Sequence, residues 1–175
     1  MNYFKLFGLE AKFTVELGQL TERYQTLQKN VHPDRFAHAS SQEQMLAVQK
    51  SAMINDAYQT LKHPLKRAEY MLIQRDTEIP NEQTSFSDNA FLMRQMELRE
   101  MLAEIKFSND VDTAIFEVNQ ILDSEFEQLF RSMQVHLSKE TSTDNQLACE
   151  DLYKLKFYQK LHIELDRLED LLFDE

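Results

Sequence analysis

The sequence predicts an all-α protein in which a helical hairpin is followed by a three-helix bundle. Its 175 residues include only two glycines and three prolines, a composition that favours long helices over strands and tight turns. Apolar residues recur at spacings of three and four along most of the chain, as on the buried face of an amphipathic helix. That periodicity is lost over residues 73–87, where Pro80 and Asn81 occur, so we expect two helical units joined there.

The first unit is expected to span residues 1–74. A short helix containing Tyr3 and Phe4 is predicted to end at Gly8. A second helix is predicted from near Thr14, with an apolar stripe made of Leu17, Leu20, Tyr24, Leu27 and Val31. A third is predicted over residues 41–62, with apolar contacts from Met45, Val48, Ala52, Ile54, Tyr58 and Leu61. Pro64, at a position that favours the first turn of a helix, begins a fourth.

The joint is expected at residues 75–87 and the second unit at residues 88–175. Its first helix is predicted over residues 88–107. The next begins near Asp110 and carries an apolar stripe of Val111, Ile115, Val118, Leu122, Phe126, Leu129, Met133 and Leu137. The last is predicted from about Leu147, which leaves residues 138–145 as a loop, and its stripe is Leu161, Leu165, Leu168 and Leu172. Three amphipathic helices of this length predict a three-helix bundle.

The net charge of −11 is unevenly distributed along the chain. Residues 1–74 carry a net charge of +2, whereas residues 75–175 carry −13. The acidic second unit argues against nucleic acid as the main partner, because phosphate binding depends on clustered positive charge. Two units of opposite sign suggest two different partners, although a well-solvated acidic surface is the simpler alternative.

Cellular location and metal content follow from the same composition. No apolar run is long enough to cross a membrane, and the start of the chain lacks the features of a signal or transit peptide. We therefore expect a cytoplasmic protein that binds no membrane. Cys149 is the only cysteine, so neither an internal disulfide nor a cysteine-based metal site is expected.

The segment His32-Pro33-Asp34 interrupts the helical pattern. Proline forces the preceding residue away from helical angles, so a stiff turn must separate the second and third helices. Such a turn is either a plain connector or a presented contact surface. The dipeptide His63-Pro64 occurs without an aspartate between two other helices, where the connector interpretation is sufficient.

An enzymatic function finds little support in the sequence. The five histidines fall on different predicted elements, and no glycine-rich phosphate loop or nucleophile motif is present. His32 and Asp34 form a conceivable acid–base pair, but an exposed turn offers no pocket that would tune their pKa values. We expect no catalytic residues, no metal site and no cofactor.

The first seventy residues resemble a J domain. The resemblance rests on "YFKLFGL" at 3–9, the stripe of the second helix, His32-Pro33-Asp34, and "INDAYQTLKHPLKRAEY" at 54–70. It implies that the loop contacts a DnaK-type chaperone and stimulates its ATPase, with the basic face of the second helix beside it. The implied chaperone-binding residues are His32, Pro33, Asp34, Arg23, Lys29 and Arg35. Arg23 and Lys29 fall outside the apolar stripe and are expected to be exposed, where ordinary solvated surface is the alternative for each.

The segment "FLMRQMELREMLAEI" at 91–105 contains more apolar residues than one buried stripe needs. Spacing assigns Phe91, Leu98, Leu102 and Ile105 to the core. The remaining apolar residues, Leu92, Met93 and Met96, lie beside three glutamates that share a helix face, Glu97, Glu100 and Glu104. The segment has two interpretations: a wide buried face with a solvated acidic edge, or a partner surface that is apolar at its centre and acidic at its rim.

The J domain, the joint and this segment together are similar to the HscB family, J-domain co-chaperones of iron–sulfur cluster assembly. "AFLMRQMELREML" and "LKFYQKL" are the carboxy-terminal landmarks. The resemblance implies two partners, the DnaK-type chaperone HscA and the scaffold protein IscU, in the bacterial cytoplasm. The implied scaffold-binding residues are Leu92, Met93, Met96, Glu97, Glu100, Glu104 and Phe157. For Phe157, a core role is a close competitor, because it lies at the edge of a buried stripe.

Overall fold

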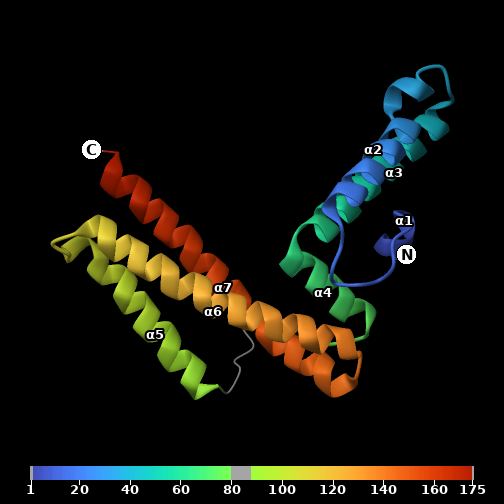
Figure 1. Ribbon diagram of the computed structural model, residues 1–175. Coiled ribbons are helices and arrows are strands. Elements are labelled where there is room, and N and C mark those ends of the chain that lie inside the picture. The colour runs from blue at the N-terminus through green and yellow to red at the C-terminus, as the bar shows by residue number, and fades with distance from the viewer. Residues whose placement is uncertain (1, 80–87, 175) are drawn as a thin grey trace. The chain divides into compact units, whose positions relative to one another are not determined.

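A computed structural model describes residues 2–79 and 88–174, and every regular element in those ranges is helical (Figure 1). The chain divides into two compact units, Met1–Asp76 and Thr77–Glu175. The first unit contains α1 (Tyr3–Leu6), α2 (Leu17–Val31), the 3-10 helix η1 (Pro33–Phe36), α3 (Ser41–Lys62) and α4 (Pro64–Gln74). The second contains α5 (Asn89–Glu104), the 3-10 helix η2 (Ile105–Phe107), α6 (Val111–Lys139) and α7 (Ser142–Phe173). The predicted all-α fold class is confirmed.

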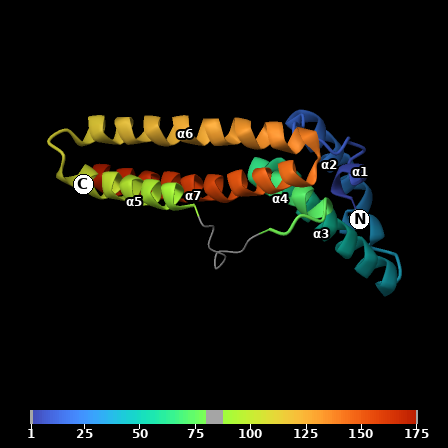
Figure 2. The same ribbon diagram turned by 90° about the horizontal axis from the view of Figure 1, so that it is seen from below.

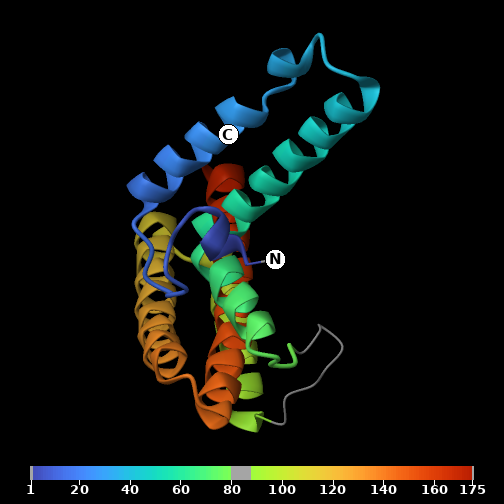
Figure 3. The same ribbon diagram turned by 90° about the vertical axis from the view of Figure 1, so that its right-hand side faces the viewer.

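Helices α2 and α3 form an antiparallel hairpin with η1 at its tip (Figure 3). Apolar burial holds the hairpin together, since Leu20 of α2 and Leu61 of α3 are both fully shielded from solvent. The rings of Tyr24 and Tyr58 stack across the seam with their centroids 4.0 Å apart. Ser40 caps α3 by accepting a hydrogen bond from the backbone N–H of Glu43. Phe4 of α1 is buried in the same unit.

Three residues of α3 that were predicted to make apolar contacts are exposed in the structure. Ala47, Ile54, Ala57, Tyr58 and Leu61 form its buried stripe. Met45, Val48 and Ala52, which were predicted to supply apolar contacts, are all exposed. The physical reason is rotational: these three residues lie on the side of the helix away from Ile54, because each residue advances by about 100° around the axis.

Helix α2 also begins later than predicted, at Leu17 rather than near Thr14. Glu16 occupies the N-cap position with extended backbone angles, φ −77° and ψ 108°. Val15 and Glu16 lack the strong capping preference of serine or asparagine, so the sequence gives little signal for the start of this helix.

The second unit is the predicted three-helix bundle, in which α6 and α7 lie side by side along most of their length (Figure 2). Each helix contributes to one apolar core, to which α5 brings Leu98, α6 brings Leu122, and α7 brings Leu161 and Leu165. The stripe predicted for α6 includes its five buried residues, Ile115, Val118, Leu122, Met133 and Leu137. Two aspartates, Asp88 and Asp110, cap α5 and α6 through their side chains.

The loop predicted over residues 138–145 is wrong. α6 continues to Lys139 and α7 begins at Ser142, so the connection is only Glu140 and Thr141. Glu140 adopts a left-handed conformation with φ 59°, and the Thr141 hydroxyl oxygen accepts the backbone N–H of Asp144 at 3.0 Å. Serine, threonine, aspartate and asparagine favour helix starts as well as loops, and here they form the first turn of α7.

The predicted joint at residues 75–87 falls partly outside the described residues, which omit 80–87. Within the described part, α4 ends at Gln74, and Asp76 adopts a positive φ of 55°. None of the helices in residues 2–79 and 88–174 is long and apolar enough to cross a membrane.

Candidate chaperone-contact loop and client-binding face

The His32-Pro33-Asp34 loop is exposed at the tip of the α2–α3 hairpin. His32 has φ −58° and ψ 133°, the extended conformation that the following proline requires, and α2 therefore ends at Val31. Pro33 is the first residue of η1, where a missing backbone N–H costs no helical hydrogen bond. The side chains of His32 and Asp34 are 58% and 92% exposed. The loop thus projects a fixed turn into solvent.

The imidazole of His32 stiffens this turn from within. Its Nδ1 accepts a hydrogen bond from the backbone N–H of Asp34 at 3.2 Å, and the backbone N–H of Arg35 donates to the His32 carbonyl at 3.0 Å. A ring nitrogen that accepts an N–H carries no proton, so in the neutral ring the proton lies on Nε2. The Asp34 carboxylate lies 3.5 Å from the same Nδ1, in open solvent. This geometry suits a presented contact, because nothing in it desolvates an acid–base pair.

The three basic residues predicted near the loop have different environments. Lys29 and Arg35 are exposed, as expected. Arg23 is not: it is half-buried, and its Nη1 donates to the backbone carbonyls of Phe7 at 2.6 Å and Gly8 at 2.5 Å. The prediction of an exposed Arg23 is therefore wrong, because the long side chain reaches back to the turn after α1.

Gly8 is part of that arrangement. Its φ of +62° is a left-handed conformation that residues with a side chain rarely adopt, and an added Cβ would lie 2.9 Å from Nη1 of Arg23. The absence of a side chain at Gly8 therefore lets Arg23 hold α2 against the turn that follows α1.

The predicted client-binding face on α5 is exposed. Leu92, Met93 and Met96 are 55%, 63% and 67% exposed. The helix buries its other stripe instead, with Leu98 and Leu102 in the bundle core. The three glutamates that share the outer face, Glu97, Glu100 and Glu104, are exposed as well. Of the two interpretations of this segment, the wide buried face does not fit these positions, and an apolar centre with an acidic rim does.

Phe157 of α7 packs against α5. It is half-buried against the bundle core, and its ring meets the ring of Phe91 edge-on with their centroids 5.7 Å apart. The guanidinium of Arg99 lies 5.4 Å from the centre of the Phe157 ring, and Arg99 also pairs with Glu164 at 3.0 Å. These contacts hold α5 on α7, while part of the Phe157 ring stays exposed, and its role in scaffold binding remains a prediction.

No role was predicted for Arg94 from the sequence, but in the structure its side chain holds Glu97, one of the three exposed glutamates of α5. Its guanidinium pairs with Glu97 on α5 and with Glu125 on α6, each at 2.7 Å. Hydrogen bonds to Glu125, and then to Glu97, raise the pKa of Arg94. The three-residue spacing of Arg94 and Glu97 is a signal for an ion pair within one helix, whereas the pairing with Glu125 depends on the packing of α5 on α6.

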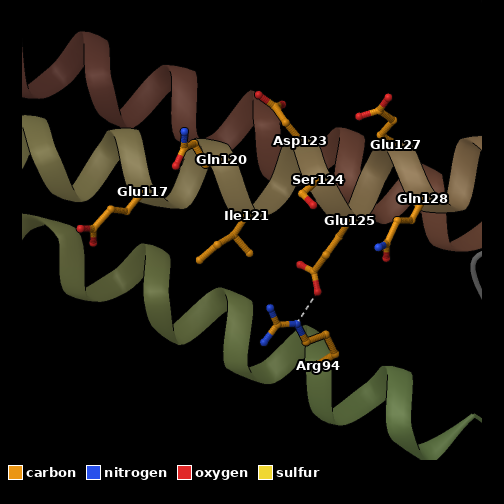
Figure 4. A pocket seen from close by; sticks show the side chains of 9 residues that line it. All are labelled: Arg94, Glu117, Gln120, Ile121, Asp123, Ser124, Glu125, Glu127 and Gln128. Atoms are coloured by element: carbon orange, nitrogen blue, oxygen red, sulfur yellow. Dashed lines mark hydrogen bonds and ion pairs between the residues drawn. The ribbon is translucent and has the colours of Figure 1, made fainter.

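The ion pair between Arg94 and Glu125 borders an open hollow of about 880 Å³ between α5 and α6 (Figure 4). Its lining is mainly acidic and amide side chains together with Ile121: Arg94, Glu117, Gln120, Ile121, Asp123, Ser124, Glu125, Glu127 and Gln128. Tyr158 of α7 is buried, and burial together with the nearby Glu125 raises the pKa of its hydroxyl to about 12.

Comparison with known families agrees with the two units. Residues 2–70 match the family described as "DnaJ domain", and residues 87–166 match the family described as "HSCB C-terminal oligomerisation domain". A J-type hairpin with an exposed His-Pro-Asp loop, followed by this second domain, defines a J-domain co-chaperone. Proteins of this class act with a chaperone of the DnaK type.

Relatives of known name match the chain over its whole length. The co-chaperone protein HscB homolog of Colwellia psychrerythraea is 62% identical and covers 100% of both chains. That of Shewanella halifaxensis is 47% identical over 99% of this chain and 100% of its own. Chaperone HscB from Vibrio cholerae has a solved structure that superimposes with a TM-score of 0.88 at 39% identity, over 99% of this chain and 100% of that one. Human co-chaperone protein HscB gives a TM-score of 0.87 at 30% identity, over 97% of this chain and 82% of that one.

The chain belongs to the HscB family of co-chaperones. The resemblance drawn from the sequence motifs is thereby confirmed, and so are the J domain and the HscB-type second domain.

Proposed function

We propose that this protein stimulates the ATPase of the DnaK-type chaperone HscA and delivers the iron–sulfur scaffold protein IscU to it. The first unit contacts HscA and the second unit holds IscU. Delivery on one chain raises the local concentration of client at the chaperone and so assists the maturation of iron–sulfur proteins. The protein itself catalyses no reaction in this scheme, since ATP is hydrolysed by HscA. As part of this proposal, the activity is assigned to the bacterial cytoplasm.

The contact with HscA is assigned to the loop and to the charges beside it. His32, Pro33 and Asp34 are exposed, and the hydrogen bond between His32 and the backbone of Asp34 holds their relative positions. Lys29 and Arg35 supply positive charge next to the loop. Arg23 supports the contact indirectly, because its guanidinium is occupied by backbone carbonyls.

The contact with IscU is assigned to the exposed face of α5, and this face carries the proposal. Three apolar side chains on one helix, each more than half exposed, have no role in their own core. Leu92, Met93 and Met96 supply the apolar centre, and methionine side chains adapt readily to a partner's shape. Glu97, Glu100 and Glu104 form the acidic rim. Phe157 of α7 contributes to this contact by holding α5 in place through Phe91 and Arg99.

A steady-state ATPase assay tests the proposal. HscA is measured alone, with this protein, with IscU, and with both together. We expect this protein to raise the ATPase rate, and we expect IscU to raise it further when both are present. Absence of any effect of this protein on HscA would contradict the first half of the proposal.

Direct binding separates IscU from another client. IscU is titrated against the full chain and the change in an isothermal calorimetry signal is recorded. If HscA is stimulated but IscU is not bound, the protein is a J-domain co-chaperone whose bundle serves a different client, and the assignment of the α5 face to IscU is lost.

A further inference from the structure

A strip of apolar side chains lies on the outer face of α3, mostly in the amino-terminal half of the helix. We call Met45, Val48 and Ala52 the α3 outer strip, because their spacings of three and four place them in one row along the helix. Met45 is 63% and Val48 is 55% exposed. Leu46 is 50% exposed, but it lies about 100° further round the helix from Met45 and is not part of this row. Single exposed apolar residues are ordinary on protein surfaces, but a group of this kind at one end of a small unit marks an interaction surface.

The strip begins one residue after Gln44, whose side chain holds the segment that follows the His32-Pro33-Asp34 loop. Nε2 of Gln44, the residue before Met45, donates hydrogen bonds to the backbone carbonyls of Phe36 at 2.9 Å and Ala37 at 3.3 Å. These bonds fasten η1 to the first turns of α3 at the tip of the hairpin (Figure 3). The amino-terminal end of α3 is therefore held close to the segment that follows the loop.

The exposed basic residues near the loop are too few to account for the affinity of the proposed chaperone contact, so we expect apolar side chains to contribute to it. Arg23 is engaged by the carbonyls of Phe7 and Gly8, so Lys29 and Arg35 remain as the exposed basic residues among those predicted for the contact. Exposed charges of this kind contribute little net free energy to binding and act mainly on the rate and orientation of encounter. Burial of apolar side chains is the usual source of affinity at the centre of an interface.

We propose that the α3 outer strip is a second part of the chaperone interface and receives an apolar segment of the DnaK-type chaperone. This inference rests on the proposed function, since it extends the same contact from the loop onto α3. A second copy of this chain is a poorer occupant, because a strip of a few side chains is far smaller than the roughly 800 Å² per partner of a stable interface. The client is a poorer occupant too, because its proposed face lies on α5 in the other unit.

Paired glutamine substitutions test the strip. Met45→Gln with Val48→Gln removes its two largest apolar side chains and keeps good helix formers at both positions. Leu17→Gln with Ile73→Gln is the matched control, since these residues are 49% and 51% exposed in the same unit, at the far end of α2 and in α4. HscA ATPase is measured against increasing concentrations of each full-length variant, and thermal unfolding is recorded for each.

We expect the Met45/Val48 pair to raise the concentration that gives half-maximal stimulation by at least about five-fold. Maximal stimulation at saturation is expected to remain, because His32, Pro33 and Asp34 are intact. The control pair is expected to leave both quantities unchanged, and neither pair should lower the unfolding temperature appreciably, because all four side chains are exposed.

The outcomes separate this inference from the proposed function. If the unsubstituted protein fails to stimulate HscA, the proposed function itself fails. If the unsubstituted protein stimulates HscA and the Met45/Val48 pair does so at the same concentration, the strip is not part of the interface. An equal loss in both pairs, a loss of IscU binding instead, or a change in sedimentation coefficient alone would likewise overturn the assignment to the chaperone.

Discussion

His32 has two neighbours that give it a defined position in the loop. Pro33 holds the backbone of His32 extended, and the backbone N–H of Asp34 donates to its ring at Nδ1. The remaining surface of the imidazole is available to another molecule, since 58% of the side chain is exposed. A residue with this geometry contributes little to the core of its own unit, which agrees with its proposed role in a contact.

His32→Gln should therefore abolish stimulation of HscA without unfolding the protein. Glutamine keeps a polar side chain but lacks the ring that holds the Asp34 amide. His63→Gln is the matched control, because His63 is also exposed and also precedes a proline, yet it connects α3 to α4. HscA ATPase and IscU binding are measured for both variants. A folded His32→Gln protein that stimulates as well as the control would contradict the role of the loop.

Met93 and Met96 provide a corresponding test on α5. Met93→Ala with Met96→Ala should weaken IscU binding by about 1 kcal/mol or more if both side chains are buried in the complex. The free energy of unfolding should change little, because the two side chains are 63% and 67% exposed in the free protein. Isothermal calorimetry with IscU gives the first quantity and urea unfolding the second.

The control for that pair lies on α7. Ile163→Ala with Leu171→Ala removes apolar side chains that are 47% and 72% exposed in the same bundle. If the control weakens IscU binding as much as the α5 pair does, the effect belongs to general surface hydrophobicity rather than to the α5 face.

Individual side chains were predicted from sequence with uneven success. The exposed positions of Met93 and Met96 follow from helical spacing, because the core stripe of α5 leaves them outside. Arg23 was misplaced, since spacing gives the direction of a Cα–Cβ bond but not the reach of a long side chain toward the carbonyls of a turn distant in sequence. The link from Arg94 to Glu125 also needed the packing of two helices.

Helices α6 and α7 have a polar seam near the connection between them. The Ser132 hydroxyl of α6 donates to the Asp151 carboxylate of α7 at 2.7 Å. His136 of α6 lies 2.9 Å from Asp144 of α7. Burial raises the pKa of Asp151, and the hydrogen bond from Ser132 and the positive charge nearby offset this only in part.

Asp151→Asn should therefore change how stability depends on pH. A carboxyl whose pKa is higher in the folded than in the unfolded state binds more protons when folded, so its contribution to stability falls as pH rises from the unfolded pKa, near 3.8, through the folded pKa. At neutral pH the half-buried charge costs stability, and asparagine removes that charge while keeping an oxygen that accepts from Ser132. We expect the variant to be as stable as the original protein or more stable at pH 7.

Urea unfolding at pH 4 and pH 7 measures this effect. The difference in the free energy of unfolding between the variant and the original protein should shift in favour of the variant as pH rises. Ser138→Ala is a control, because this exposed serine donates to a carbonyl of its own helix and should give the same difference at both pH values. A variant whose relative stability falls with pH would contradict the assigned burial of the charge.

The helices themselves were largely predictable, and their ends were less so. The start of α3 at Ser41 and of α4 at Pro64 follows from a capping serine and a proline. The start of α7 was missed by five residues, because Ser142, Thr143, Asp144 and Asn145 are typical of loops and of first helical turns alike. Met45, Val48 and Ala52 were taken for core residues, since apolar character alone does not distinguish a buried stripe from an exposed contact face.

The two units of the chain differ in net charge, and each has a hydrophobic core of its own. Each has its own buried core, the first around Leu20 and Leu61 and the second around Leu122 and Leu161. Their net charges of +2 and −13, over residues 1–74 and 75–175, oppose binding of the same partner to both. Joining the two units then raises the effective concentration of the client at the chaperone, because a client held by one unit remains close to a chaperone held by the other.

Separating the two units into fragments tests whether their covalent connection is needed for delivery of the client. Fragments 1–76 and 77–175 follow the division of the structure into two compact units, and circular dichroism first establishes that each is helical in isolation. We expect fragment 1–76 to stimulate HscA and fragment 77–175 to bind IscU. An equimolar mixture of the two should nevertheless lose the additional stimulation that IscU gives with the intact protein at concentrations below the individual dissociation constants. If the mixture and the intact protein respond equally to IscU, the client acts on HscA without being carried to it, and the covalent connection has no part in delivery.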